Sequence, residues 1–173
     1  GHEQGIDSQH APTHLRQIEQ GVEYFVRGIA GTDTLILVSA DHGQIDTTDA
    51  DQTLIGDHPQ LADCLTLPLC GEPRAAFCYV HPDRAETFET YCREVLGERF
   101  ELHRSRDLLD AGLFGLGAPN PRLPERIGDY TLIARDNNVI RELLPFEESF
   151  KQIGVHGGLS SAELMVPLCV IRA

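Results

Sequence analysis

Four residues of the sequence belong to types that bind divalent metal ions, and they occur in three short glycine-containing segments. His2 lies in GHEQG, Asp41 and His42 lie in VSADHGQ, and His156 lies in GVHGGLS. A glycine beside a histidine lets the backbone turn sharply, so the imidazole can point into a site. A single histidine of this kind usually has an ordinary hydrogen-bonded role, and Asp41 beside His42 could also form a simple turn. Together, however, the four residues are the imidazole and carboxylate set that suits zinc or a related divalent ion.

The Asp41–His42 pair follows an apolar segment, DTLILVS, that predicts a buried strand over residues 33–39. Continuous runs of aliphatic residues are typical of parallel sheets covered on both faces, and open α/β sheets place ligands at the carboxyl ends of such strands. Adjacent residues of a straight strand point to opposite faces, so Asp41 and His42 can bind one ion only if the strand has already ended in a turn. Gly43 makes that turn easy to form.

Apolar residues before this strand recur at helical spacing and predict a helix that ends at Gly31. Ser8 or Asp7 is available as its N-cap, and Pro12 falls near its first turn. Helix, short loop and strand would form one α/β unit. The apolar positions are Leu15, Ile18, Val22, Phe25, Val26 and Ile29.

The rest of the chain predicts a second group of elements. Residues 74–80 and 99–103 have strand patterns around a helix over 83–97, which would form a βαβ-like unit with Phe88, Cys92 and Val95 inward. Ser105 is expected to cap a short helix, the proline-rich segment 118–128 to form a loop, and 129–134 to form a strand. The last strand, within 163–171, contains Pro167, which favours an edge or bulge position.

The composition excludes several classes of protein. Acidic residues outnumber basic residues 27 to 14 among 173 residues, so the formal net charge is −13. This charge repels polyanions and argues against long nucleic acid, although a bound cation would let the chain hold a small phosphate ester. No apolar segment is long enough to span a bilayer, and the five cysteines lack the CxxC spacing of zinc–thiolate sites. Free thiols in a reducing compartment are the simplest account, so we expect a soluble, cytoplasmic globular chain.

Three segments, GHEQGIDS, TLILVSADHGQ and GVHGGLSSAELMVPL, resemble the alkaline phosphatase superfamily in their order and spacing. Within it, they are similar to the branch of type I phosphodiesterases and nucleotide pyrophosphatases. The resemblance implies an α/β fold, an alkaline-phosphatase-like sandwich with a mainly parallel sheet flanked by helices. Residues 1–173 would be the carboxyl-terminal part of one such domain, with a variable α/β subdomain over about 70–135.

The resemblance also implies two divalent metal ions, most often zinc, about 4 Å apart. Asp41 and His42 would bind the ion that also contacts the nucleophile, and His2 and His156 would bind the second. The family's Thr or Ser nucleophile and further aspartate ligands lie upstream of the matched segments. No catalytic nucleophile is therefore assigned within this chain.

The remaining polar residues near these segments are expected to have other roles. Ser39 lies inside the predicted strand. The others are expected as helix caps (Ser160 and Thr13), in a solvated acidic loop (Asp46, Asp49 and Asp51) and at the start of a helix (His58).

The sequence therefore predicts part of a metal-dependent hydrolase of phosphodiester or pyrophosphate bonds, acting on a small phosphate ester such as a nucleotide derivative. The isolated chain is expected to be inactive, because in-line attack needs the upstream Thr or Ser. It should bind one ion through all four ligands or none, and an uncovered sheet surface should favour self-association. Sulfatases, phosphonate hydrolases and phosphomutases share the metal framework and stay open as alternatives, as does a non-catalytic domain that keeps the fold for binding or assembly.

Overall fold

The computed structural model describes residues 1–145 and 152–173, which divide into two compact units. Unit 1 contains the described residues of 1–46, 152–156 and 160–173, and unit 2 contains 47–145 and 157–159. The subdomain expected over about 70–135 falls within unit 2.

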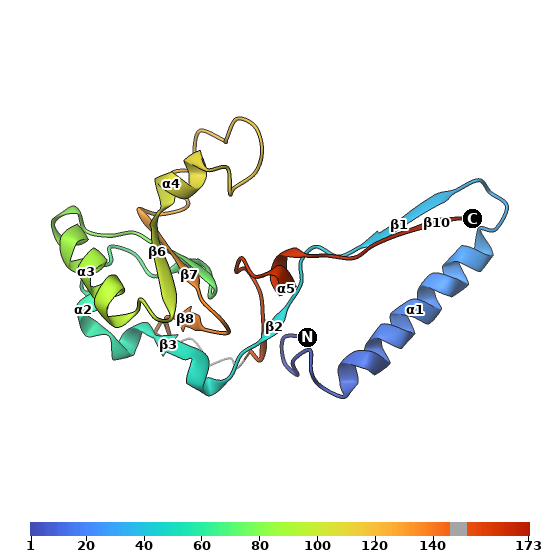
Figure 1. Cartoon of the computed structure of the whole chain (residues 1–173), viewed down its shortest axis with the longest axis horizontal. Coiled ribbons are helices and arrows are strands. Elements are labelled where there is room, and N and C mark those ends of the chain that lie inside the picture. The colour runs from blue at the N-terminus through green and yellow to red at the C-terminus, as the bar shows by residue number, and fades with distance from the viewer. Residues whose placement is uncertain (146–151) are drawn as a thin grey trace. The chain divides into compact units, whose positions relative to one another are not determined.

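Unit 1 consists of two helices and two pairs of antiparallel strands, which carry their labels in Figure 1 except for β9. Strand β1 pairs with β10, and β2 pairs with β9. The bounds are α1 His10–Gly28, β1 Leu35–Ser39, β2 Ile45–Asp46, β9 Gly154–Val155, α5 Ser161–Leu164 and β10 Leu168–Arg172. The helix and the strand predicted from the apolar patterns are both present.

Strand β1 confirms the strand predicted over 33–39, but in the described residues it is not buried and it has no parallel partner. It pairs antiparallel with β10, and among the described strands only β3 and β8 pair in parallel. A strand that is apolar at every position presents apolar side chains to both faces, and one face of the β1–β10 ribbon is open. The apolar side chains of that face are 58% to 69% exposed, namely Leu35, Leu37, Leu168 and Val170.

Helix α1 lacks the caps that the sequence predicted. Its N-cap is Gln9, which makes no side-chain capping hydrogen bond, so neither Ser8 nor Asp7 caps it, and Thr13 lies inside its first turn. The chain before the helix is held instead by Asp46, which accepts hydrogen bonds from two backbone amides of the preceding loop. No residue of α1 is buried, so its apolar stripe contributes little packing within unit 1.

Unit 2 combines an antiparallel sheet of strand order β4-β5-β7-β6, the parallel pair β3–β8 and several short helices. Strands β5 and β6 each pair with β7, so the predicted βαβ-like unit is split by a strand from later in the chain. The strands are β3 Gln52–Leu54, β4 Cys70–Glu72, β5 Ala75–Cys78, β6 Phe100–Arg104, β7 Tyr130–Ala134 and β8 Val139–Arg141. The helices are η1 Asp49–Asp51, η2 Ile55–Asp57, α2 Pro59–Ala62, η3 Pro82–Arg84, α3 Ala85–Val95 and α4 Ser105–Asp110.

The hydrophobic core of unit 2 lies around α3 and the four-stranded sheet. Phe88 and Cys92 are buried as predicted, but Val95 is 51% exposed. Leu96 takes the inward position instead, because it continues the four-residue spacing of the other two. Phe100 and Leu132 from the sheet complete the centre of this core.

Two predictions about helix starts in unit 2 had different outcomes. His58 is the N-cap of α2, as predicted for the residue before Pro59. Ser105, however, does not cap α4, whose N-cap is Arg104. Its buried hydroxyl donates to the carbonyl of Ile127 and hydrogen-bonds the hydroxyl of Thr131, both at 2.8 Å, because α4 packs against β7.

Pro167 lies directly before β10, which has a single pairing partner, in agreement with the predicted edge position. Its carbonyl accepts a hydrogen bond from the Ser39 hydroxyl at 2.9 Å. None of the helices in the described parts of the chain has the length and apolar character that crossing a membrane requires.

Candidate metal centre

The Asp41–His42 turn begins just after β1 ends at Ser39. His42 Nε2 lies 3.7 Å from Asp41 Oδ2, so the two side chains have come round to each other. The Asp41 carboxylate also accepts a hydrogen bond from the backbone amide of His42 at 3.1 Å. A hydrogen bond from its own backbone amide, followed by the charge of His42, holds the pKa of Asp41 below its usual value. The strand has thus ended before the pair, which is the condition for both residues to bind one ion.

Gly43 holds this turn against α5. Its backbone amide donates to the carbonyl of Glu163 at 2.7 Å, and a side chain on Gly43 would collide with the backbone of Ala162. Glu163 is itself only 2% exposed, and its carboxylate accepts a hydrogen bond from Ser160, the N-cap of α5, at 2.6 Å. The sequence analysis did not single out Glu163, although the Ser-x-x-Glu spacing of Ser160 and Glu163 is a local signal for a helix start. Its contact with Gly43, in contrast, depends on the tertiary fold.

The β2–β9 pair brings His42 and His156 together. Ile45, which follows His42, lies opposite Val155, which precedes His156. The two imidazole rings stack with centroids 3.7 Å apart and planes 19° apart. The ring of His2 lies 5.3 Å from that of His156, so three histidines from separate segments gather in unit 1.

The loop that carries His2 is bound to both strands of this pair. The His2 carbonyl accepts hydrogen bonds from the amides of Ile153 and Gly154, at 2.8 Å and 3.1 Å. On the β2 side, Asp46 accepts two backbone hydrogen bonds from the same loop. The prediction that Asp46 belongs to a solvated acidic loop is therefore wrong, because the folded chain brings backbone donors to its carboxylate. Asp51 also has a structural role, since its carboxylate accepts from the amide and hydroxyl of Thr48.

The inner nitrogens of two imidazoles lie next to backbone carbonyls. Nδ1 of His2 is 2.8 Å from the Gly154 carbonyl, and Nδ1 of His42 is 2.7 Å from the Gly43 carbonyl. Since a carbonyl can only accept, each Nδ1 carries the proton in these hydrogen bonds, and each Nε2 keeps its lone pair. The amide nitrogen of the Gln44 side chain lies 3.1 Å from the same Nδ1 of His2. If this Nδ1 carries the proton, the Gln44 amide would be rotated so that its oxygen faces the ring.

The cluster has the donors of a metal centre without converging on a single ion. Among residues 1–145 and 152–173, no group of three or more His, Cys, Asp or Glu side chains is placed to hold one ion. The lone pair of an imidazole nitrogen lies in the plane of the ring. Two nearly parallel stacked rings 3.7 Å apart therefore cannot both direct a lone pair into the space between them.

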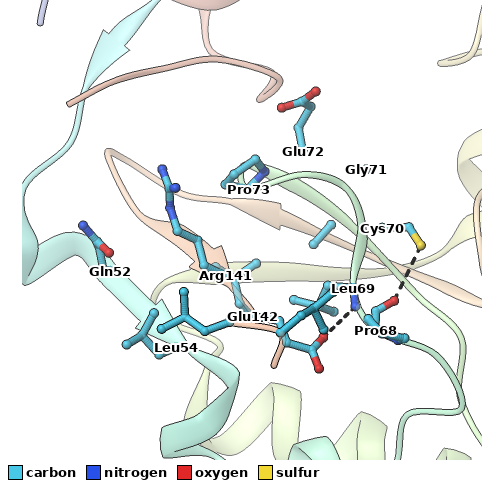
Figure 2. Close-up of a pocket in the computed structure, with 14 residues that line it drawn as sticks. Gln52, Leu54, Pro68, Leu69, Cys70, Gly71, Glu72, Pro73, Arg141 and Glu142 are labelled. Atoms are coloured by element: carbon cyan, nitrogen blue, oxygen red, sulfur yellow. Dashed lines mark hydrogen bonds between the residues drawn. The ribbon is translucent and has the colours of Figure 1, made fainter. Parts of the chain in front are cut away.

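Unit 2 contains a cavity of about 530 Å³ bounded by β3, β4 and β8 (Figure 2). The Glu142 carboxylate in its wall accepts a hydrogen bond from the Leu69 amide at 2.8 Å. Burial lowers the pKa of Arg141, and Glu72 adds a second carboxylate to the lining. A lining with two carboxylates and one guanidinium does not favour a phosphate ester, and none of the four residues of the candidate metal centre lines this cavity.

No protein-family profile matches the sequence, and no curated protein sequence matches it. Solved structures do match. Human ectonucleotide pyrophosphatase/phosphodiesterase 5 superposes with a TM-score of 0.73 at 13% identity, over 98% of this chain and 43% of that chain. The murine protein gives 0.70 at 13% identity, and its inactive variant in complex with AMP gives 0.69 at 14%, each over 97% of this chain and 43% of the other.

The chain thus spans less than half the length of the structures that it matches. At these identities the likeness concerns the fold. The chain shares its mixed α/β fold with part of these nucleotide pyrophosphatase/phosphodiesterase structures, which belong to the family that its three sequence segments resemble.

Proposed function

We propose that the chain is the carboxyl-terminal part of a metal-dependent hydrolase of phosphodiester or pyrophosphate bonds. The observation that carries the proposal is the gathering of four ligand-type side chains from three distant segments. These side chains are His2, Asp41, His42 and His156. Each has the type and the position that the family resemblance assigns to a metal ligand.

Asp41 and His42 would hold one ion, and His2 and His156 would hold the second. Two ligand atoms of one tetrahedral zinc ion lie about 3.3 Å apart. That is close to the 3.7 Å between Asp41 Oδ2 and His42 Nε2. The spacing of 3.7 Å between the His42 and His156 rings is likewise close to the separation of ions in two-metal sites, roughly 3.5 to 4 Å. When bound, the ions supply the positive charge that a phosphoryl group needs and that a chain of formal charge −13 lacks.

The backbone around these four side chains would orient them for metal binding. Donation from Nδ1 to a backbone carbonyl fixes the rings of His2 and His42 and leaves Nε2 to bind, an arrangement common among metal-bound histidines. The contact of Gly43 with α5 fixes the turn that carries Asp41.

The nucleophile and the substrate are proposed by likeness to the solved structures. The murine protein is inactive as a threonine-to-alanine variant and is in complex with AMP in that form. We therefore place a threonine or serine nucleophile outside these 173 residues and expect a nucleotide derivative as the substrate. The same outside part would supply the strands that turn β1 into a member of a mainly parallel sheet.

Zinc titration by calorimetry tests this proposal. The metal-free chain should bind zinc saturably, His156→Ala should weaken binding by about 10-fold to 100-fold, and His14→Ala should leave it unchanged. His14 is an exposed histidine of α1 and controls for the loss of any imidazole. AMP should then bind the zinc-loaded chain and not the metal-free chain. Equal losses in the two variants, or no saturable binding by the unaltered chain, would count against the proposal.

A further inference from the structure

The carboxylate of Asp46 is bound by a loop that precedes it by about 40 residues. Its Oδ1 accepts a hydrogen bond from the amide of Ile6 at 2.7 Å, and its Oδ2 accepts one from the amide of Asp7 at 3.1 Å. Hydrogen bonds to an ionised acceptor are stronger than neutral ones, and here both oxygens of one carboxylate are engaged. The Asp46 carboxylate is therefore bound to the backbone of the loop through both of its oxygens.

The loop from Gly1 to Ser8 folds closely around this carboxylate. Gly5 has a φ of 77°, and a Cβ at Gly5 would lie 2.5 Å from Asp46 Oδ2, so the position accepts only glycine. The turn is closed by a hydrogen bond from the Gly5 amide to the Gly1 carbonyl at 2.8 Å, and by one from the Ser8 hydroxyl to the Gly5 carbonyl at 3.1 Å.

His2 is carried by the same loop, on the side that faces β9. Asp46 ends β2 and lies opposite Gly154 of β9, and Gly154 in turn contacts both the carbonyl and the ring of His2. The β2–β9 pair thus holds the loop at two points, through the Asp46 carboxylate and through Gly154. Without the Asp46 carboxylate, the loop would be hydrogen-bonded to the β2–β9 pair only through His2, which is exposed to solvent.

We propose that Asp46 is a positioning residue that holds the imidazole of His2 beside His156. Its role would be to hold the loop that carries His2, because both of its oxygens accept hydrogen bonds from the backbone of that loop. Its contribution to zinc binding would pass through His2. This part of the inference rests on the proposed function, whereas the placement of His2 can be tested without any metal.

The metal-free arm of the test compares Asp46→Ala with Asp7→Ala. Asp7→Ala also removes one carboxylate charge, but it keeps the backbone amide of residue 7 that donates to Asp46. In Asp46→Ala, the amides of Ile6 and Asp7 should exchange faster with solvent, and the NMR contact between the His2 and His156 rings should disappear. Asp7→Ala should keep the protection of Ile6 and the ring contact. Retention of both signals in Asp46→Ala would overturn the inference.

The metal arm is a double-mutant cycle measured by zinc titration. Asp46→Ala should lower zinc affinity about 10-fold to 100-fold, as far as His2→Ala does, and the double variant should lose no more than either single one. Asp46→Asn keeps one acceptor oxygen and should restore part of the affinity. Additive losses would overturn the inference, because Asp46 would then act independently of His2. Absence of zinc binding by the unaltered chain would count against the proposed function. The amide exchange of Ile6 and Asp7 and the contact between the His2 and His156 rings would then decide the role of Asp46.

Discussion

Replacing Gly43 by alanine should push the Asp41–His42 turn away from α5 and weaken zinc binding. The φ of Gly43 lies outside the left-handed region, so the cost of a side chain at this position is steric. A Cβ there would lie 2.9 Å from the carbonyl carbon of Ala162, closer still to its oxygen, and 3.1 Å from the Cα of Glu163. All three neighbours are backbone atoms, which cannot rotate away as the end of a side chain could.

The size of the effect follows from these contacts. Ordinary contact distances are about 3.5 to 4 Å, so the turn and α5 must separate by on the order of 1 Å. The hydrogen bond from the Gly43 amide to the Glu163 carbonyl, 2.7 Å long, would lengthen or break. A shift of this size in a group that supports metal ligands costs about 10-fold to 100-fold in affinity, which corresponds to about 1.4 to 2.7 kcal/mol.

The assay pairs zinc calorimetry with NMR of the histidine rings, and Gly21→Ala is the matched control. Gly21 lies inside α1, where an added Cβ meets nothing within 4 Å, so alanine there should stabilise the helix by up to about 1 kcal/mol without changing zinc affinity. In Gly43→Ala the ring contact between His42 and His156 should weaken even without metal. An alanine at position 43 that left both the ring contact and the affinity intact would refute the packing argument.

Three further predictions concern the core, the pH dependence and the open ribbon. Phe88→Ala should destabilise unit 2 by about 3 to 5 kcal/mol in urea unfolding, because the ring is fully buried, whereas the exposed Val95→Ala should cost less than about 1 kcal/mol; similar midpoints for both would contradict the described core. Glu89→Gln should lower the free energy of unfolding by about 1 kcal/mol at pH 7. Hydrogen bonds from Tyr130 and then from Arg104 lower the pKa of Glu89. The contribution of the carboxylate to stability is therefore present above the ordinary pKa of a glutamate and is lost as the pH falls through the lowered pKa. The difference between the two proteins should therefore shrink by pH 3, and an unchanged difference would argue against the hydrogen-bonded carboxylate. The open face of the β1–β10 ribbon should make the mass measured by light scattering rise with concentration, and Leu37→Lys should reduce this without adding negative charge; a constant monomer mass would refute self-association.

Elements with a strong local signal were predictable from the sequence. The apolar spacing of α1 and α3, and the aliphatic run of β1, depend on residues a few positions apart, so the chain pattern alone identified them. The ends of these elements were not predictable in the same way. The expected caps Ser8 and Ser105 make other hydrogen bonds, because the fold offers each of them a different partner.

The sheet was less predictable than its strands. A run such as LILVS specifies a strand whose two faces must be covered, but not the direction of its partner. In the described residues that partner is β10, which runs antiparallel, and one face of the ribbon remains open.

The sequence by itself determined which side chains are of a metal-binding type, because histidine and aspartate beside glycine are recognisable wherever they occur in the chain. Only the tertiary structure decided that they meet. His2 and Gly154 are 152 residues apart in the chain, yet they are joined directly by hydrogen bonds. The two-residue β2–β9 ladder likewise brings the segments of His42 and His156 together. The carboxylate of Asp46 accepts hydrogen bonds from the amides of Ile6 and Asp7, which lie 40 and 39 residues earlier in the chain. The local pattern therefore predicted a solvated loop, because these partners are distant in the sequence. Residue type is a local property, whereas a hydrogen-bond partner is a consequence of long-range pairing.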